Sequence, residues 1–469
     1  MVSSVIKKSQ LEGARRLDAE YYQPELLSLS SRLYSQKLKL LKDFTEKVFS
    51  GPFGSTLKSD SYQSAGIPFI RIGDIADVFI SRNSLIFISP EEHKRIHSTY
   101  LRPGDIVFSK IGTVGRLSVI SDDLGEVNIS ENNIGIRFSK ISPELRVYLL
   151  FFLLSKYGQT QILRKASGNI QLKLNVSDIE TISIPEVSDR VLKDFLNLYK
   201  QLIDYKKESE ILYFQAENLL FEGLKIKDLN LGDEAGFVVM LSEIKENGRC
   251  DAEYFQPKYK KLAEYIKKNC NGVLLGDLVT MKKGIEPGAE EYQEPSDAEA
   301  MEGKKGKQFI RVSSLSKFGV NDSDQKYLSE ELYQKLKGDF EPKKGEILLT
   351  KDASPGIAYV LKENIEGIMA GGILRLKLKN KEIEDEYLSL CVNSVVGQMQ
   401  AERDAGGSVI AHWKPEQIKN ILIPILPKPT QQKIANLARQ SHESRKKAKQ
   451  LLEEAKRNVE ELIEKGGKA

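Results

Sequence analysis

The stretch Asp18-Ala-Glu-Tyr-Tyr-Gln-Pro24 occurs a second time in the sequence, as Asp251-Ala-Glu-Tyr-Phe-Gln-Pro257. Six of the seven positions are identical, and the two copies lie 233 residues apart. A match that combines acidic, aromatic and amide residues in one order is not expected by chance. It indicates an internal duplication, which can place two similar modules about a pseudo-twofold axis.

Shorter correspondences extend the match over the whole chain. The matching pairs are Ser9 and Ser242, Arg16 and Arg249, Phe69–Arg71 and Phe309–Arg311, Pro103–Ile106 and Lys344–Ile347, Lys110 and Lys351, and Ile184–Pro185 and Ile423–Pro424. Their order is kept while the offset drifts between 233 and 241 residues, so insertions fall between shared elements. Two long copies do not make a solenoid, and the sequence therefore predicts two duplicated domains.

The composition is that of a globular chain with room for more than one core. The chain has 469 residues, 40% hydrophobic and 29% charged, and a net charge of +4 that still permits a basic groove on one face. No apolar run approaches the roughly 20 residues that span a bilayer, and the N-terminus lacks a signal-peptide core, so we expect a cytoplasmic protein without membrane contact. Three cysteines without a CxxC pair and four scattered histidines predict that no structural metal site exists.

Each copy divides into two parts of different character. The first parts, about 40–185 and 272–425, combine Gly and Pro turns with short β-branched runs, which predicts a mixed sheet with helices packed on it. The second parts, about 188–222 and 430–465, contain no Pro and follow a helical period. The predicted fold class is α+β, with two tandem mixed α/β domains, each followed by a long helix.

The two long helices are expected to pair with each other, since both carry a heptad pattern with apolar ends and small or polar residues near the middle. A polar layer in such a seam favours one register. The alternative is that each helix packs only on its own domain. The apolar residues expected to pair the helices are Leu192, Phe195, Tyr199, Leu202, Tyr213, Leu220, Ile434, Leu437, Leu451 and Leu462.

The sequence lacks the motifs of several enzyme classes. It has no GxxxxGK[ST] phosphate loop, no GxSxG nucleophile elbow and no Asn/Asp-Pro-Pro-aromatic tetrapeptide of the enzymes that methylate an extruded base. The glycine-rich runs Gly51–Gly54 and Gly112–Gly115 lack the GxGxxG spacing of a dinucleotide site. We therefore expect no catalytic residues, and a protein that binds without cutting.

Basic and amide side chains recur in the turns of the sheet-rich parts, and these residue types read base edges and clamp phosphates. Any one of them, taken alone, is more often a solvated surface residue. The candidate DNA-binding residues are Lys58, Arg71, Lys110, Arg116, Arg164, Lys165, Asn169, Gln171, Lys173, Asn175, Lys282, Lys283, Arg311, Lys351, Arg403, Ser408, His412 and Lys414. The segments Arg164–Lys173 and Arg403–Lys414 are the stronger candidates, because they align between the copies while their side chains differ.

Three phrases of the first copy, Ser50–Lys58, Gly66–Asp74 and Arg102–Arg116, resemble a target recognition domain of the specificity (S) subunit of type I restriction–modification enzymes. The stretches Ser167–Gln171 and Ile182–Pro185, which run into a long helix, fit as well. The second copy departs from the pattern, with Gly284-Ile-Glu-Pro-Gly288 at the first turn and an insertion at about 289–307.

The resemblance implies a specificity subunit without catalytic activity, in which each recognition domain reads one half of a bipartite target in double-stranded DNA. The long helices would pair as an antiparallel coiled coil and set the unread spacer. The implied partners are two modification subunits, which bind S-adenosylmethionine, and restriction (motor-nuclease) subunits, which use ATP and Mg²⁺; this chain itself would need no cofactor.

The expected boundaries are a first recognition domain at 1–185, a first helix and linker at 186–232, a second domain at 233–427 and a second helix at 428–469. Two other functions stay open. One is the target-recognition part of a fused methyltransferase or nuclease, and the other is a tandem scaffold that binds only protein.

Overall fold

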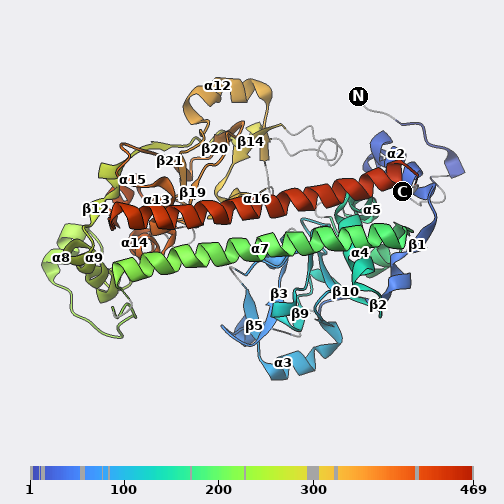
Figure 1. Ribbon diagram of the computed structural model, residues 1–469, viewed down its shortest axis with the longest axis horizontal. Coiled ribbons are helices and arrows are strands. Elements are labelled where there is room, and N and C mark those ends of the chain that lie inside the picture. The colour runs from blue at the N-terminus through green and yellow to red at the C-terminus, as the bar shows by residue number, and fades with distance from the viewer. Residues whose placement is uncertain are drawn as a thin grey trace. The chain divides into compact units, whose positions relative to one another are not determined.

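The computed structural model consists of two compact units (Figure 1). The first comprises Met1–Asp204 and Lys447–Ala469, and the second Tyr205–Lys446. The residues described are 4–9, 11, 16–52, 57, 59–76, 78–82, 85–168, 172–226, 229–292, 306–321, 326–406 and 411–466. Each unit contains one copy of the repeat and a part of each long helix.

Unit 1 is built mainly from short strands, with short helices between some of them. Its elements are η1 (Ala19–Tyr22), α2 (Pro24–Tyr34), β1 (Leu38–Leu40), η2 (Leu41–Phe44), β2 (Thr45–Ser50), η3 (Ser59–Ser61), β3 (Ile67–Ile70), η4 (Ile72–Asp74), β4 (Val78–Phe79), β5 (Ile86–Ile88), α3 (Pro90–Arg95), η5 (His97–Thr99), β6 (Tyr100–Leu101), β7 (Ile106–Ser109), β8 (Leu117–Val119), η6 (Asp122–Leu124), β9 (Val127–Ile129), β10 (Asn133–Phe138), α4 (Pro143–Leu154), α5 (Lys156–Lys165), α6 (Val176–Glu180), β11 (Ser183–Pro185) and the first part of α7 (Asp189–Leu224). The strands form sheets of order β2-β10-β7-β8-β4, β5-β3-β9-β6 and β1-β11.

Strand β10 lies at the centre of unit 1, and all six of its residues are buried. Ile134 and Ile136 share a core with α4, whereas Gly135 faces Phe49 and Leu101 on the other side. This alternation is the two-residue period of a strand. The two polar residues of the strand are buried with a partner, since Asn133 Nδ2 donates to the Ile70 carbonyl at 2.8 Å and Arg137 donates to the Tyr100 carbonyl at 2.5 Å. The single mixed sheet expected from the sequence is therefore two larger sheets with a second core between them.

Unit 2 repeats this arrangement. Its elements are the last part of α7, α8 (Leu241–Asn247), α9 (Pro257–Asn269), β12 (Val273–Leu274), α10 (Leu275–Leu278), β13 (Val279–Lys283), η7 (Ala289–Glu291), β14 (Lys307–Ile310), η8 (Val312–Ser314), β15 (Leu315–Ser316), β16 (Gly319–Val320), β17 (Lys326–Leu328), α12 (Glu330–Phe340), β18 (Ile347–Thr350), β19 (Ala358–Val360), β20 (Gly367–Met369), β21 (Ile373–Leu378), α13 (Asp385–Asn393), α14 (Val395–Asp404), α15 (Pro415–Lys419), β22 (Leu422–Ile423) and the first part of α16 (Lys428–Glu464). The sheet β13-β21-β18-β19 corresponds to β2-β10-β7-β8, and β17-β14-β20 corresponds to β5-β3-β9.

The correspondence includes strand direction. In both units the middle strand of the smaller sheet pairs antiparallel with one neighbour and parallel with the other, as β3 does with β5 and β9 and β14 does with β17 and β20. The duplication predicted from the repeated heptapeptide is confirmed at the level of topology.

The long helices α7 and α16 pack against each other in an antiparallel sense (Figure 1). In unit 2, the Ser209 and Ser441 hydroxyls lie 3.1 Å apart, and Ser441 Oγ also donates to the Ser209 carbonyl at 2.7 Å. One turn away, Ser444 Oγ donates to a Glu208 carboxylate oxygen at 2.8 Å. Lower residue numbers on α7 thus pair with higher residue numbers on α16, as in an antiparallel helix pair. The serines form the polar layer that the heptad pattern predicted.

The burial of the predicted pairing residues falls into two groups. Phe195, Leu202, Tyr213, Leu220 and Ile434 are buried, and Leu192, Tyr199, Leu437, Leu451 and Leu462 are partly buried against a core. Toward the end of α16 the fully buried positions lie one residue further along than expected, at Leu452, Val459 and Ile463. An α-helix has 3.6 residues per turn, so a strict heptad count drifts away from the buried stripe.

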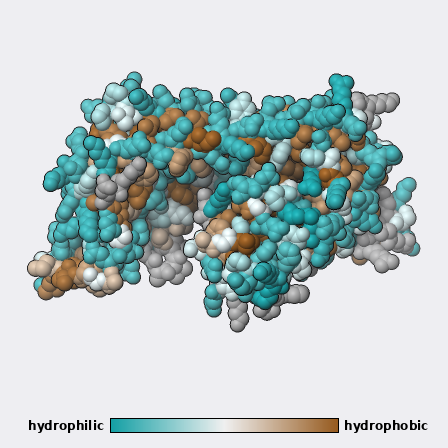
Figure 2. Space-filling model, turned by 60° about the horizontal axis from the view of Figure 1, so that its bottom comes forward, coloured by the Kyte–Doolittle hydropathy of each residue, from teal (hydrophilic) through white to brown (hydrophobic). Residues whose placement is uncertain are grey.

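Hydrophilic side chains cover most of the surface that Figure 2 presents. Among the described residues, no helix is both long and apolar enough to cross a membrane.

The borders of the two units differ from the expected domain boundaries, since each unit takes in a part of both helices.

Candidate nucleic-acid interface

Two candidate cations of unit 1 follow directly after strand ends, on either side of the turn that joins β9 to β10. Arg71 comes after β3 and Lys110 after β7. The Ser130 amide donates to the Ile70 carbonyl at 2.9 Å, and the Lys110 amide donates to the Asn132 carbonyl at 2.9 Å. Backbone bonds to the turn between β9 and β10 thus place Arg71 and Lys110 near each other, at the ends of β3 and β7.

Unit 2 places Arg311 and Lys351 in the same way, after β14 and β18. The Ala370 amide donates to the Ile310 carbonyl at 2.9 Å, and the Lys351 amide donates to the Gly372 carbonyl at 2.9 Å. The two cations matched between the copies by sequence therefore occupy equivalent positions in the two units.

A closed loop stands beside each of these lysines. In unit 1, Ser167 and Lys173 exchange backbone hydrogen bonds of 3.0 and 2.8 Å, and the Leu174 amide donates to the Lys110 carbonyl at 3.0 Å. In unit 2, the His412 amide donates to the Gly406 carbonyl at 2.9 Å, and the Trp413 amide donates to the Lys351 carbonyl at 2.7 Å.

We call the segments 167–173 and 406–412 the recognition loops. Their tips, at 169–171 and 407–410, lie outside the described residues. In each loop the two ends bond to each other, and the C-terminal end bonds to the residues that follow β7 or β18, in every case through the backbone. The two segments that the sequence favoured most are thus built on one scaffold with different side chains.

Positive charge gathers beside the loop of unit 1. The side chain of Lys173 is exposed, and the pKa of Lys110 is lowered by burial and, to a smaller extent, by the charge of Lys173. Lys110 Nζ also lies 3.5 Å from the Glu131 carbonyl oxygen. Two neighbouring cations repel each other and would be stabilised by a bound anion such as a phosphate.

The corresponding site in unit 2 contains an acid. Lys351 Nζ pairs with Asp352, and His412 Nδ1 lies 2.9 Å from Asp352 Oδ1. Burial opposes ionisation of this carboxyl, but hydrogen bonds from Lys351 and His412 leave the pKa of Asp352 below its ordinary value. The same backbone position therefore offers a less positive surface in unit 2.

A glycine is required where the chain leaves the edge strand in each unit. A Cβ atom on Gly51 would lie 2.1 Å from the Ser130 carbonyl oxygen, and one on Gly284 would lie 2.2 Å from the Ala370 carbonyl oxygen. This close approach explains why the two turns share their first glycine although their sequences diverge after it.

The repeated heptapeptide is connected to the recognition loop. Arg16 donates to both carboxylate oxygens of Asp18, at 2.7 and 2.6 Å, and this bonding lowers the pKa of Asp18. Its third nitrogen, Nη1, donates to the carbonyls of Arg164 and Ala166, each at 2.9 Å. These carbonyls end α5, directly before the loop, so the joint fixes where the loop begins.

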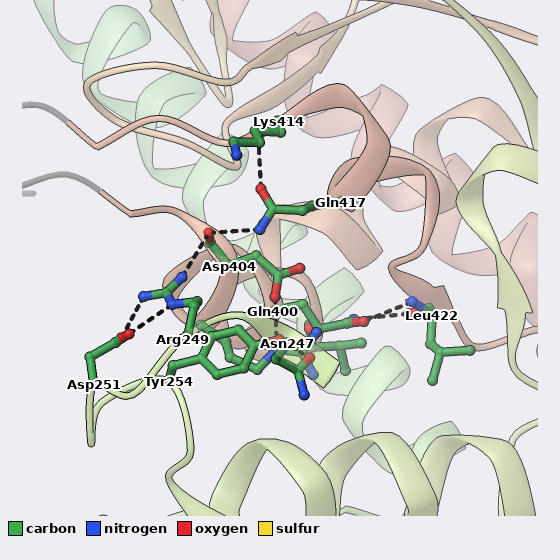
Figure 3. A network of polar contacts seen from close by, with 11 residues as sticks. Asn247, Arg249, Asp251, Tyr254, Gln400, Asp404, Lys414, Gln417 and Leu422 are labelled. Carbon is green, nitrogen blue, oxygen red and sulfur yellow. Dashed lines mark hydrogen bonds and ion pairs between the residues drawn. The ribbon is translucent and has the colours of Figure 1, made fainter. Parts of the chain in front are cut away.

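Unit 2 contains the same fork (Figure 3). Arg249 donates to Asp251 at 2.8 and 2.5 Å and to the Asp404 carbonyl at 3.4 Å, at the end of α14. Gln417 Nε2 donates to the same carbonyl at 3.2 Å, and Tyr254 places its ring 4.4 Å from the Arg249 guanidinium. Sequence comparison found the two arginines only as matching positions; their contact with the loop requires the fold.

Three other candidates have their side chains engaged within the unit. Arg164 donates to Ser30 Oγ at 2.6 Å and stacks on the Tyr21 ring, and Lys165 Nζ donates to Thr181 Oγ1 at 2.8 Å. Arg403 Nε donates to Asp404 Oδ1 at 2.8 Å. These contacts support the joint and the loop base, and a role in DNA binding for these three residues stays a prediction.

The remaining candidates lie at strand and helix ends. Asn175 and Lys414 precede α6 and α15, where their amides donate to Asp178 Oδ2 at 2.8 Å and to Gln417 Oε1 at 3.1 Å. Lys282 pairs with Asp339 at 2.6 Å, Lys283 is exposed at the end of β13, and Arg116 is half-buried before β8. Lys58, Asn169, Gln171 and Ser408 lie outside the described residues.

A family model for the type I restriction modification DNA specificity domain matches residues 38–212 and 268–454. A curated relative, the type I restriction enzyme EcoBI specificity subunit of Escherichia coli, is 27% identical over 149 residues, which are 31% of this chain and 30% of that protein. The match thus spans less than a third of the relative's length.

Two solved structures are similar over most of the chain. The S subunit of a type I restriction–modification system from M. genitalium is 12% identical, with 91% of this chain and 94% of that chain covered and a TM-score of 0.39. The HsdS subunit from Thermoanaerobacter tengcongensis is 13% identical, with 93% and 97% covered and a TM-score of 0.29.

Proposed function

Since this chain belongs to the family of type I restriction–modification DNA specificity domains, we propose that it is the non-catalytic subunit that reads a bipartite target in double-stranded DNA. Each unit reads one half of the target. The observation that carries this proposal is the pair of recognition loops, which have the same backbone attachment and different side chains in the two units. One scaffold with two sets of reading residues suits a target whose halves differ in sequence.

The proposed division of labour follows from the chemistry of each position. Lys110 contacts a phosphate, because a lysine held by its own backbone at a strand end presents a charge at a fixed place. Lys351 has the equivalent position in unit 2, where its ion pair with Asp352 leaves less charge for a phosphate. The recognition loops read base edges, since their side chains are the part of the site that differs between the copies. The other candidate residues support these two tasks.

The proposal assigns the chemical steps to partner subunits. Two modification subunits supply S-adenosylmethionine-dependent methylation, and restriction subunits supply ATP- and Mg²⁺-dependent translocation and cleavage, so this chain holds none of these cofactors. The complex acts in the cytoplasm, where the chromosome is accessible.

A binding experiment tests the proposal. The full chain, assembled with its modification subunit, is titrated with duplex DNA at several salt concentrations. We expect Lys110→Ala to weaken binding to all sequences by a similar factor and to reduce the salt dependence by about one phosphate contact. Lys37→Ala, an exposed lysine paired with Glu186, is the matched control and should leave both quantities unchanged.

Two results would contradict the proposal. Absence of salt-dependent DNA binding by the assembled complex would favour a scaffold that binds only protein. Methyl transfer to DNA by the purified chain alone would make the protein an enzyme.

A further inference from the structure

Two histidines and a glutamate of unit 1 come together away from the recognition loop. His93 lies on α3, His97 begins η5, and Glu126 directly precedes β9. One nitrogen of each ring and one oxygen of the carboxylate all lie within 4.8 Å of one another. The His93 ring is buried, whereas His97 and Glu126 are exposed.

Asn128 fixes the orientation of the His93 ring. The Asn128 amide nitrogen donates to the Ile96 carbonyl at 3.2 Å, so its Oδ1 is the atom that faces His93 Nδ1, at 2.5 Å. An amide oxygen can only accept, and Nδ1 must therefore carry the proton. A fully buried amide that holds one ring nitrogen in this way leaves the other, Nε2, aimed outward.

His93 Nε2 lies 3.4 Å from Glu126 Oε2. In the neutral ring, with its proton on Nδ1, both of these atoms are acceptors, so the contact is favourable only when a cation is shared between them. A second proton on the ring would satisfy this pair. His97, whose ring lies 5.2 Å from that of His93 and stacks on Tyr100, adds a further nitrogen at the same place.

From this arrangement we propose that His93, His97 and Glu126 bind one divalent transition-metal ion of the zinc class. Two imidazoles and a carboxylate favour Zn²⁺, Co²⁺ or Ni²⁺ over Mg²⁺, which prefers oxygen ligands. Ligands about 2.0–2.2 Å from a tetrahedral ion are about 3.3 Å apart, which the His93–Glu126 pair already matches. His97 offers its ring nitrogen within 4.8 Å of the other two ligand atoms.

The Asn128 bond has the form of an outer-shell contact to a metal-ligating histidine. The ion would tie α3 and η5 to the start of β9, and thereby secure one end of the smaller sheet. This proposal departs from the expectation that the chain has no metal site. The His-x-x-x-His spacing of His93 and His97 is visible in the sequence, but the third ligand lies 29 residues further on and is found only in the fold.

Metal binding is measured by calorimetric titration of the full, tag-free chain with Zn²⁺, and by the visible absorption of added Co²⁺. We expect one saturable site per chain, no comparable site for Mg²⁺, and a raised melting temperature with Zn²⁺. His97→Phe keeps the ring that stacks on Tyr100, and Glu126→Gln keeps the side-chain shape. Each variant should bind Zn²⁺ at least about tenfold more weakly and lose most of the melting shift.

The control is His412→Asn, which removes an exposed histidine of unit 2 and should bind Zn²⁺ as the unsubstituted chain does. The proposal is overturned if the unsubstituted chain shows no saturable Zn²⁺ site, because the His93–Glu126 contact is then an ion pair with a protonated ring. It is equally overturned if His97→Phe and Glu126→Gln bind with unchanged affinity, since the ion then lies elsewhere. Circular dichroism of each variant confirms that it is folded.

Discussion

The guanidinium of Arg16 uses its three nitrogens for two different tasks, since two of them hold Asp18 and the third holds the carbonyls at the end of α5. Arg249 does the same in unit 2. A planar fork of fixed donors suits this geometry, and the single ammonium of a lysine does not. The side chain that positions a recognition loop is thus about 150 residues away from that loop in the sequence.

Replacing this arginine should loosen the loop and the fold together. We expect Arg16→Ala to lower the free energy of unfolding by about 1–2 kcal/mol, a range that allows for the partial exposure of the ion pair. Urea denaturation measures the change. Arg190→Ala, an exposed arginine at the start of α7, is the control and should stay within about 0.5 kcal/mol. Equal stability of the two variants would show that the fork does not hold the loop.

A second prediction at the scale of single residues concerns Gly51 and Gly284, at which the chain leaves an edge strand. Gly51→Ala should destabilise the chain by about 2–3 kcal/mol, because its Cβ would overlap the Ser130 carbonyl and a backbone atom cannot move aside cheaply. The matched control is Gly73→Ala, where nothing lies within 4 Å of the added atom. Thermal unfolding of both variants distinguishes a steric requirement from a general effect of removing glycine.

At the scale of single elements, the middle of α16 contains an unusual buried residue. His442 lies among the rings of Tyr213, Phe318 and Tyr359, and burial, aided by the charges of Lys362 and Arg445, lowers its pKa to about 3. The nearby Glu386 is itself paired with Lys362. The ring is therefore neutral at pH 7 and contributes to the polar middle of the helix pair without a charge.

This histidine should make stability depend on pH. Its pKa is about 3 in the folded chain and near 6.5 when unfolded, so the unfolded chain binds more protons between these values and stability is lost as pH falls from about 6.5 toward 3. The expected loss between pH 7 and pH 4 is about 3 kcal/mol from this group. In His442→Phe the pH dependence of urea unfolding should be weaker by that amount; an unchanged dependence would mean that other groups cause it.

The helix pair also shows what a heptad pattern can and cannot predict. The pairing and the polar layer at Ser209 and Ser441 followed from the spacing of apolar and small residues. The position of the buried stripe near the end of α16 did not, because a helix of 3.6 residues per turn departs from a seven-residue count by a small angle in each heptad. The pattern therefore predicts the partner and misplaces Leu452 and Ile463 by one residue.

At the scale of the whole molecule, the duplication was predictable and the construction of each copy was not. Repeated phrases such as Phe69–Arg71 and Phe309–Arg311 established two copies, and the strand orders confirm them. The division of each copy into two sheets left no separate signal, since short apolar strands read alike in either sheet. The candidate cations were located by residue type, whereas their attachment to one turn depends on long-range backbone bonds that no local pattern records.

The duplication leads to a prediction for DNA recognition, which rests on the proposed function. Replacing the recognition loop 167–173 by that of a related sequence should change one half of the methylated target and leave the other half unchanged. Methylome sequencing of cells carrying the complex measures both halves. The reciprocal change at 406–412 is the control and should alter only the opposite half. A target that stays the same after both replacements would exclude the loops as the reading elements.

The recognition loops are closed at their ends, and attached to the residues after β7 and β18, by backbone hydrogen bonds, and such bonds form with almost any side chain. Substitutions within a loop should therefore leave its backbone bonds, and with them the fold, largely intact. Under the proposed function, the DNA sequence that is read can therefore change by point mutation or by exchange of a short gene segment, while the rest of the chain keeps its structure. The feature that gives the loop its fixed place is thus also the feature that lets its sequence diversify.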